Sequence, residues 1–112
     1  MMIQSEGMYM KLHKNAYWGE SLGDLKRTVT YELKYKKFAV GYYCITLPDN
    51  SENLMDIIPG EQLKFKFLRR KPRTVIGIAG TKNEAMKLAG TIIYDVYKET
   101  GGFDVTGYFS RH

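Results

Sequence analysis

One stretch, from Thr74 to Gly102, restricts the possible folds of this chain more than any other part of it. A run of mostly apolar residues at 74–79 predicts a buried strand, and the segment 82–99 that follows predicts an amphipathic helix. The apolar residues of that helix recur every three or four positions and form one stripe, which consists of Ala85, Leu88, Ala89, Ile92, Ile93, Val96 and Tyr97. The pattern therefore indicates a helix laid across one face of a sheet.

Both ends of the predicted helix carry residues that helix termini favour. Thr81 can act as the N-cap, and Glu84 stands three residues later, where a capping-box glutamate reaches back to the N–H of the cap residue. Gly101 and Gly102 end the helix, because glycine adopts the left-handed C′ conformation without a steric clash of Cβ. Gly90 stands in mid-helix, and we interpret it, with the alanines of the stripe, as a small-residue patch where the helix approaches the sheet closely.

Alternating apolar and polar residues predict further strands. We expect them at 7–14, 28–36, 38–47 and 63–67. The clearest alternation is that of 28–36, whose apolar face consists of Val29, Tyr31, Leu33 and Tyr35.

The segments between these strands predict loops and turns. Residues 15–24 indicate a loop that Tyr17 and Trp18 plug, and residues 53–56 indicate a single helical turn. The Pro-Gly pair at 59–60 predicts a tight turn, because proline presets one backbone angle and glycine supplies the positive one.

Several strands followed by one long helix favour an α+β fold. We expect a single domain, residues 1–112, with a mostly antiparallel sheet of four to six strands and one long helix near the C-terminus, at about 82–99, packed on one face. Residues 103–109 form either a short edge strand or a segment that packs back on the end of the helix. A chain of 112 residues is large enough for a hydrophobic core without metals or disulfides.

The net charge of +5 is distributed unevenly along the chain. Residues 26–47 sum to +4, residues 48–62 to −4 and residues 63–73 to +6, whereas residues 74–112 sum to zero. The excess positive charge therefore belongs to predicted strands and not to the last helix. Such a basic surface suits a polyanion, usually nucleic acid, and it also promotes solubility without any partner.

The main candidate site is a predicted basic hairpin at 64–73, where six cations fall within ten residues. If Phe65 and Phe67 face the core, the lysines line one face of the strand and the arginines surround the turn, a shape that can follow a phosphate backbone. The candidate nucleic-acid-binding residues are Lys64, Lys66, Arg69, Arg70, Lys71 and Arg73, with Lys34, Lys36 and Lys37 beside them. The alternatives are a solvated edge hairpin whose lysines prevent aggregation, and pairing with the chain's own acidic segment 48–62.

A second candidate is an anion site at the start of the predicted helix, formed by Gly80, Thr81 and Lys82. Free N–H groups and the positive end of the helix dipole favour a phosphate at such a position. The spacing differs from that of a Walker phosphate-binding loop, and a capping box also explains Thr81 and Glu84.

Catalytic and metal-binding patterns do not emerge from the sequence. The only histidines are His13 and His112, and no pair has the spacing of metal ligands. Cys44 lies in an apolar stretch without a partner nearby in the sequence, which predicts a buried, inert thiol. We therefore expect a protein that is not an enzyme and that uses no cofactor.

The sequence also predicts where the protein resides. No apolar run reaches the roughly 20 residues that span a bilayer, and the amino end shows no secretory signal. A single cysteine cannot form an internal disulfide. We expect a cytoplasmic protein with no membrane partner.

Residues 45–67 resemble part of the swapped-hairpin DNA-binding domains of the AbrB type. The corresponding elements are a strand that ends at Leu47-Pro48, a short helix from Leu54 to Ile57, the turn Pro59-Gly60-Glu61, and the inward residues Leu63, Phe65 and Phe67. The resemblance covers about a fifth of the chain and implies an intertwined homodimer that binds DNA or acts as an antitoxin-like regulator. The chain departs from the family where Ser51 and Glu52 replace an apolar residue and an arginine, and the 74–99 unit has no counterpart there.

Together these patterns predict a small non-catalytic binding domain. The leading hypothesis is nucleic-acid binding through the basic hairpin at 64–73. The alternative is a protein-interaction or assembly module that uses an exposed sheet edge or the aromatic residues Tyr9, Tyr17 and Trp18. The expected partners are a nucleic acid or an acidic protein, and a second copy of the chain.

Overall fold

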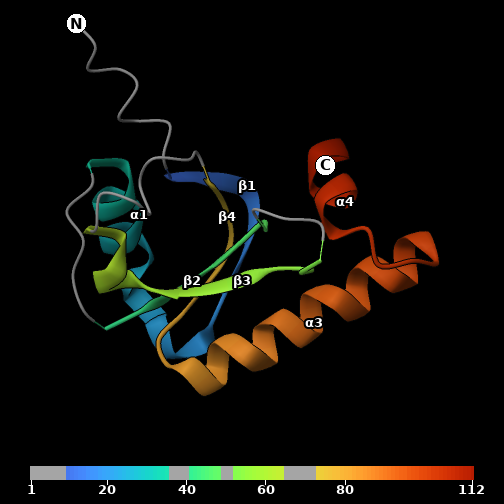
Figure 1. Ribbon diagram of the computed structural model, residues 1–112. Coiled ribbons are helices and arrows are strands. Elements are labelled where there is room, and N and C mark those ends of the chain that lie inside the picture. Colours follow the sequence, from blue (N-terminus) through green and yellow to red (C-terminus); the bar gives the residue numbers. More distant parts are fainter. Residues whose placement is uncertain (1–9, 36–40, 49–51, 65–72) are drawn as a thin grey trace, which may run out of the picture.

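The computed structural model describes residues 10–35, 41–48, 52–64 and 73–112, with the backbone alone at 10, 34–35 and 63–64. Within this part of the chain, four strands form one sheet in the order β1-β4-β2-β3 (Figure 1). The strands are β1 (Met10–Trp18), β2 (Tyr43–Thr46), β3 (Asp56–Pro59) and β4 (Arg73–Ala79). β4 runs parallel to β1 and antiparallel to β2, and β2 is antiparallel to β3. The predicted α+β class is confirmed. The sheet has four strands, within the four to six expected, but it is mixed, because β1 and β4 are parallel while the other two pairings are antiparallel.

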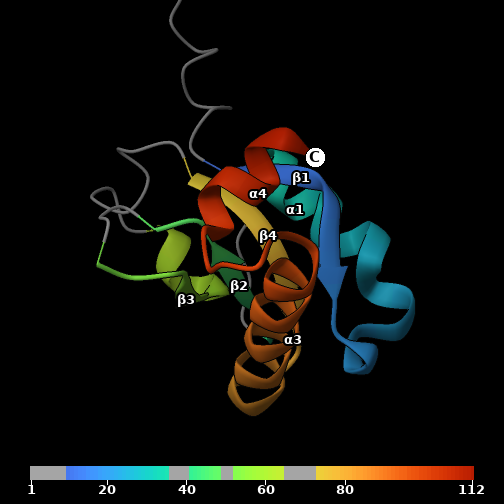
Figure 2. The ribbon, with the colours of Figure 1, turned by 90° about the vertical axis from the view of Figure 1, so that its right-hand side faces the viewer.

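Helices cover both faces of the sheet (Figures 1 and 2). One face carries the 3-10 helix η2 (Glu20–Leu25) and helix α1 (Lys26–Tyr35), and the other carries α3 (Lys82–Thr100) and α4 (Val105–Arg111). A second 3-10 helix, η3 (Gly60–Lys64), follows β3. The α1 core consists of Leu22, Val29, Leu33, Tyr42, Cys44, Ile58, Val75 and Ile78. The α3 core consists of Ile45, Ile76, Ala79, Ala85, Ile92, Val96, Val105 and Phe109.

A β-bulge in β4 decides which of its side chains enter which core. Ile45 pairs with Gly77 whereas the next residue of β2 pairs with Val75, so Ile76 is an extra residue in β4. As a result, Val75 and Ile78, three residues apart, both enter the α1 core, and Ile76 faces the opposite side. Side chains of β4 are buried on both faces of the sheet, which explains the continuous apolar run at 74–79 that predicted a buried strand.

The ends of α3 follow the sequence prediction closely. The backbone N–H of Glu84 donates to Oγ1 of Thr81 at 3.0 Å, which confirms the N-cap. Gly101 has φ of 80° and donates its N–H to the carbonyl of Tyr97 at 2.8 Å, which confirms the left-handed C-terminal glycine. Local sequence therefore sets both ends of the longest helix.

The strand predicted at 28–36 is wrong, because this segment forms the helix α1. Val29 and Leu33, four residues apart, are buried in the α1 core, whereas Tyr31 between them is 52 % exposed. Apolar residues at every second position contain pairs spaced by four, so the same pattern fits one face of a helix. The contacts with the sheet select the helical spacing.

Strand β1 extends beyond the strand predicted at 7–14 and replaces the predicted loop at 15–18. Its pairing with β4 is irregular: Leu12 pairs with Val75 and Tyr17 with Gly77, so β1 uses five residue steps where β4 uses two. The intervening residues 13–16 bow away from regular pairing and approach α4, where the candidate site lies.

The segment around residue 56 also differs from the prediction. A single helical turn was expected at 53–56, and the AbrB-type resemblance implied a short helix from Leu54 to Ile57. Instead Asp56–Pro59 forms strand β3, with Ile57 and Ile58 directed to opposite cores. The strand predicted at 63–67 begins within η3, and residues 65–72 lie outside the described residues, as do residues 36–40 of the strand predicted at 38–47.

The segment at 103–109 packs back on the long helix, as one of the two alternatives predicted. It forms α4, whose Val105 and Phe109, four residues apart, are buried in the α3 core. Asp104 caps this helix by accepting the N–H of Gly107 at 2.9 Å. The edge-strand alternative is therefore wrong.

Gly90 does not lie where the sequence suggested. It is exposed, and a Cβ placed on it meets no described atom within 4 Å, whereas Ala85 and Ala89 pack on the α3 core. The close approach of helix and sheet instead involves Gly77 of β4, because a Cβ there lies 3.0 Å from Cδ1 of Ile45 and 3.5 Å from Cδ1 of Ile92.

Substitution of these two glycines should change stability in opposite directions. Gly77→Val should lower the free energy of unfolding by about 1–3 kcal/mol, because the side chain overpacks Ile45 and Ile92. Gly90→Ala should raise it by about 1 kcal/mol, because alanine stabilises an exposed helix interior and nothing obstructs its methyl group. Urea denaturation monitored by circular dichroism measures both, and a Gly77→Val protein as stable as the parent would contradict the packing described.

Candidate polyanion-binding edge

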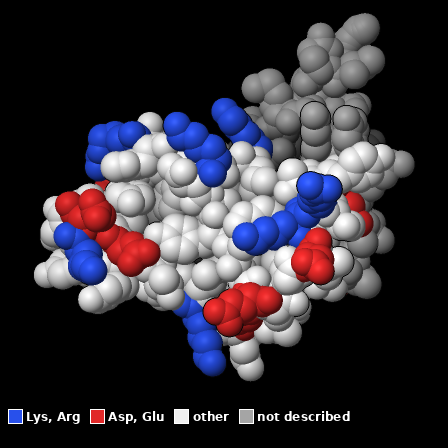
Figure 3. All heavy atoms as spheres, turned by 180° about the vertical axis from the view of Figure 1, so that it is seen from behind, with Lys and Arg blue, Asp and Glu red and all other residues white. Residues whose placement is uncertain are grey.

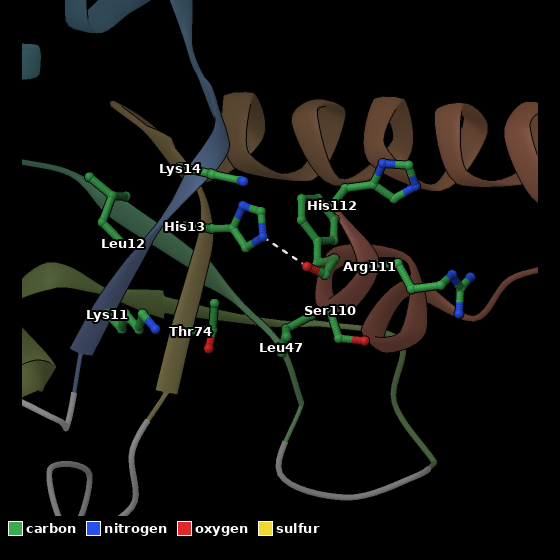
Figure 4. Close-up of a pocket in the computed structure, with 10 residues that line it drawn as sticks. Lys11, Leu12, His13, Lys14, Leu47, Thr74, Ser110, Arg111 and His112 are labelled. Carbon is green, nitrogen blue, oxygen red and sulfur yellow. Dashed lines mark hydrogen bonds between the residues drawn. The ribbon is translucent and has the colours of Figure 1, made fainter.

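A hollow of about 550 Å³ lies between β1, the start of β4 and α4 (Figure 4). Lys11 and Lys14 of β1 and Arg111 of α4 line it and are exposed. Lys11 pairs with Thr74 in the sheet, and Ser110 adds a hydroxyl from the opposite wall. Three cations and two hydroxyl groups therefore surround one cavity.

His13 fixes α4 against β1. One ring nitrogen, Nε2, lies 2.8 Å from the carbonyl of Phe109, and the other, Nδ1, accepts the backbone N–H of Asn15 at 2.9 Å. An acceptor on one side and a donor on the other require the neutral tautomer with the proton on Nε2. Both nitrogens are thus engaged, which makes His13 an anchor for α4 rather than a base or a metal ligand.

The end of α4 is held by two further contacts with the irregular part of β1. Nδ2 of Asn15 donates to the carbonyl of His112 at 2.9 Å, and the His13 ring lies edge-on to Phe109 with centroids 5.0 Å apart. Carbonyl groups at a helix C-terminus carry partial negative charge. Because His13 and Asn15 occupy two of these carbonyls, they reduce the repulsion that an anion in the hollow would meet.

A second hollow, of about 350 Å³, adjoins the first and is lined mainly by rings. The two cavities share Phe109 and His112. Tyr108 stacks on His112 with centroids 4.4 Å apart and an angle of 26° between the rings, and it meets Phe109 edge-on at 5.3 Å. Tyr17 forms another wall and donates its hydroxyl to Oδ2 of Asp95 at 2.6 Å, while burial, the largest cause, and this bond raise the pKa of Tyr17.

Charge is distributed so that this edge is positive. No Asp or Glu is among the described residues that line either hollow. Figure 3 shows the molecule from behind, relative to Figure 1. A row of Lys and Arg side chains lies along the upper edge of this view, and most of the acidic side chains lie below the row. The described side chains carry nine Lys and Arg and ten Asp and Glu, so this positive edge results from arrangement and not from an overall excess.

Arg73, one of the predicted nucleic-acid-binding residues, is an internal structural residue. Its side chain is 9 % exposed, and its Nη1 lies 3.1 Å from Oδ2 of Asp56 and 3.3 Å from Oγ1 of the buried Thr46. Asp56 belongs to the acidic segment 48–62, so at this residue the predicted pairing of the chain with its own acids is realised.

The other predicted cations are not placed by the structure. Lys34 and Lys64 have described backbones in α1 and η3 but no described side chains. The remaining cations lie outside the described residues: Lys36, Lys37, Lys66, Arg69, Arg70 and Lys71. The basic hairpin at 64–73 therefore stays a prediction.

The predicted anion site at Gly80, Thr81 and Lys82 is occupied by the chain's own carboxylate. Oε1 of Glu84 accepts the N–H of Gly80 at 2.7 Å and the hydroxyl of Ser21 at 2.6 Å, and Oε2 accepts the N–H of Ser21 at 2.9 Å. The glutamate thus reaches one residue before the cap, and it also ties η2 to α3. Lys82 is exposed beside it. Hydrogen bonds from Ser21 and then Gly80 lower the pKa of Glu84.

This carboxylate gives a pH-dependent prediction. The pKa of Glu84 is lower in the folded protein than its ordinary value. The charged carboxylate therefore stabilises the fold at pH values above the ordinary pKa, and this stabilisation is lost as the pH falls through the folded-state pKa. Glu84→Gln should therefore lower the free energy of unfolding at pH 7 by about 1 kcal/mol, the typical worth of a helix cap, and the difference from the parent should shrink in acid. Urea denaturation at pH 7 and at about pH 3 tests this. A difference of equal size at both pH values would contradict the charged cap.

Neither a metal centre nor a reactive thiol is found in the described residues. They contain no group of three or more His, Cys, Asp or Glu side chains placed to hold a metal ion. Cys44 is buried in the α1 core, and burial raises the pKa of its thiol to about 12, so the unreactive thiol form predominates at neutral pH.

Sequence reasoning missed the residues around the two hollows. Lys11 and Lys14 are separated from Arg111 by almost the whole chain, and His112 was considered only as a possible metal ligand. No local pattern joins these residues, because only the packing of α4 on β1 brings them together.

Comparison of the chain with family models, curated protein sequences and solved structures finds no match. The AbrB-type resemblance and the homodimer that it implies therefore stay predictions. Among the described residues, no helix has the length and apolar character needed to cross a bilayer.

Proposed function

We propose that this protein is a non-catalytic domain that binds nucleic acid at the edge formed by β1 and α4, together with the basic segment 64–71. The observation that carries the proposal is the hollow lined by Lys11, Lys14 and Arg111, with no Asp or Glu among its described lining residues. Clustered cations bind phosphates because they release the counterions condensed on a nucleic acid.

The position of the basic segment in the chain also favours the β1–α4 edge as the binding site. The basic segment 64–71 joins the sheet at Arg73, and Arg73 pairs with Met10 while Thr74 pairs with Lys11. The basic segment thus precedes, in the chain, the end of β4 that pairs with Met10 and Lys11. All of the excess positive charge of the sequence belongs to residues without described side chains, since the described side chains carry nine cations and ten acids.

The salt dependence of binding tests the proposal. Fluorescence anisotropy with a labelled oligonucleotide should give an affinity whose logarithm falls linearly with the logarithm of the salt concentration. The double variant Lys11→Gln and Lys14→Gln should weaken binding and reduce the salt slope by about 2, one for each lost phosphate contact. Reversal of charge at Arg69, Arg70 and Lys71 should abolish binding.

The matched control removes the same charge elsewhere. Lys87 and Lys98 are exposed on α3, away from the hollow, so Lys87→Gln with Lys98→Gln should leave the salt slope nearly unchanged. The proposal fails if the parent protein shows no binding at about 20 mM salt, where electrostatic association is strongest.

A second candidate function, interaction with an acidic protein, is favoured by the outer face of α3 and the turn after it. Four large apolar side chains there are at least half exposed: Met86, Tyr94, Tyr97 and Phe103. Phe103 stacks on Tyr97 with centroids 5.2 Å apart, and Nζ of Lys98 lies 5.6 Å from the centre of the Tyr94 ring. This apolar face with lysines beside it suits an amphipathic segment that carries acidic residues. Of the anchors predicted from sequence, Trp18 packs on the α1 core, Tyr17 bonds to Asp95, and Tyr9 lies outside the described residues.

The two functions separate by mutation. If the outer face of α3 binds an acidic partner, a synthetic acidic amphipathic helix should shift the NMR signals of α3, and Met86→Ser with Tyr94→Ser should remove the effect. The Lys11→Gln and Lys14→Gln variant should bind that peptide like the parent. Loss of peptide binding in the β1 variant, with full binding in the α3 variant, would contradict this second function.

A further inference from the structure

We propose that the nucleic acid bound at this edge is single-stranded, with one base stacked on the Tyr108–His112 ring pair and an adjoining phosphate in the cationic hollow. This inference rests on the proposed function and names its ligand class. It follows from the two adjoining hollows, one lined by rings and one by cations.

The two hollows are large enough for the parts of a nucleotide, and they adjoin each other. The ring-lined hollow of about 350 Å³ and the cationic hollow of about 550 Å³ share Phe109 and His112. A flat apolar base and a charged phosphate are joined through one sugar, so the sites for them must be neighbours. Cavities in this range accommodate small-molecule ligands.

The ring pair offers a surface on which a base can stack. Tyr108 stacks on the His112 imidazole, and His112 is exposed, so a ligand can reach the ring pair from solvent. Phe109 is buried in the α3 core and packs edge-on against Tyr108, which holds the ring pair in place. Stacking on such a surface tolerates any base, because every base has a π-face.

Electrostatics at the same place favours the phosphate. Lys14 stands on the irregular part of β1 and Lys11 just before it, while the carbonyls of Phe109 and His112 are occupied by His13 and Asn15. The described lining of this hollow contains no Asp or Glu that would oppose the anion.

A duplex cannot use both hollows at once. Its bases are stacked and paired inside the helix, so its phosphates reach the cations while the Tyr108–His112 pair stays without a base. Single strands therefore gain the stacking contribution that duplexes lack. A helix-surface ring pair without a ligand is the alternative explanation, and it predicts no preference for single strands.

The experiment compares a labelled oligothymidine of about 15 nucleotides with a mixed-sequence duplex of the same length, by anisotropy at two salt concentrations. Single strands should bind at least about fivefold more tightly. His112→Ala should weaken binding to single strands by about fivefold to a hundredfold and weaken duplex binding much less, and His112→Trp should restore single-strand binding. Tyr94→Ala, an equally exposed aromatic position on α3, is the matched control and should bind like the parent.

Each outcome distinguishes this inference from the proposed function. Equal affinity for both ligands, or single-strand binding that is insensitive to His112→Ala, overturns the single-strand inference and leaves nucleic-acid binding intact. Failure to bind either ligand at low salt overturns both. Displacement of the oligonucleotide by AMP at equimolar concentration would make a free nucleotide the ligand and would also overturn the single-strand inference. Unchanged circular dichroism and thermal unfolding of His112→Ala confirm that the variant is folded.

Discussion

Burial of strand β4 is the constraint on which the rest of the structure depends. Residues 75–79 are all buried, and β4 pairs with β1 on one side and β2 on the other. A strand with no exposed face is stable only when other elements cover both faces of its sheet. Helix α1 supplies one cover and α3 the other, and the bulge at Ile76 divides the β4 side chains between the two cores. The absence of a side chain at Gly77 lets Ile45 and Ile92 meet over the strand.

Irregular pairing between β1 and β4 links this core to the candidate site. Between their shared pairs, β1 contains more residues than β4. The side chains of His13 and Asn15, which lie in this extra segment, bond to the carbonyls of α4. The same irregular pairing holds cations and aromatic rings around two adjoining hollows. The irregular segment 13–16 therefore carries the side chains that hold α4 at the site.

The engagement of acidic side chains explains how a nearly neutral described surface acquires a positive edge. Asp56 bonds to Arg73, Glu84 to Ser21 and Gly80, and Asp95 to Tyr17. Each of these carboxylates serves as an internal contact between elements and is absent from the lining of the hollows. The described lining of the two hollows therefore holds Lys and Arg but no Asp or Glu, which the net charge of the chain does not reveal.

The sequence by itself determined the strand at 74–79, the helix that follows and both of its ends, because caps, glycine and a stripe of apolar residues are local signals that act within a few residues. Only the tertiary structure decided that 26–35 is a helix, since alternating apolar residues fit both periods and contact with the sheet selects one. The same holds for β3, where Ile57 and Ile58 each find a core on a different face. The site was beyond sequence reasoning for a related reason. Lys11 and Arg111 are a hundred residues apart in the chain, and they meet only because hydrogen bonds from His13 and Asn15 hold α4 on β1.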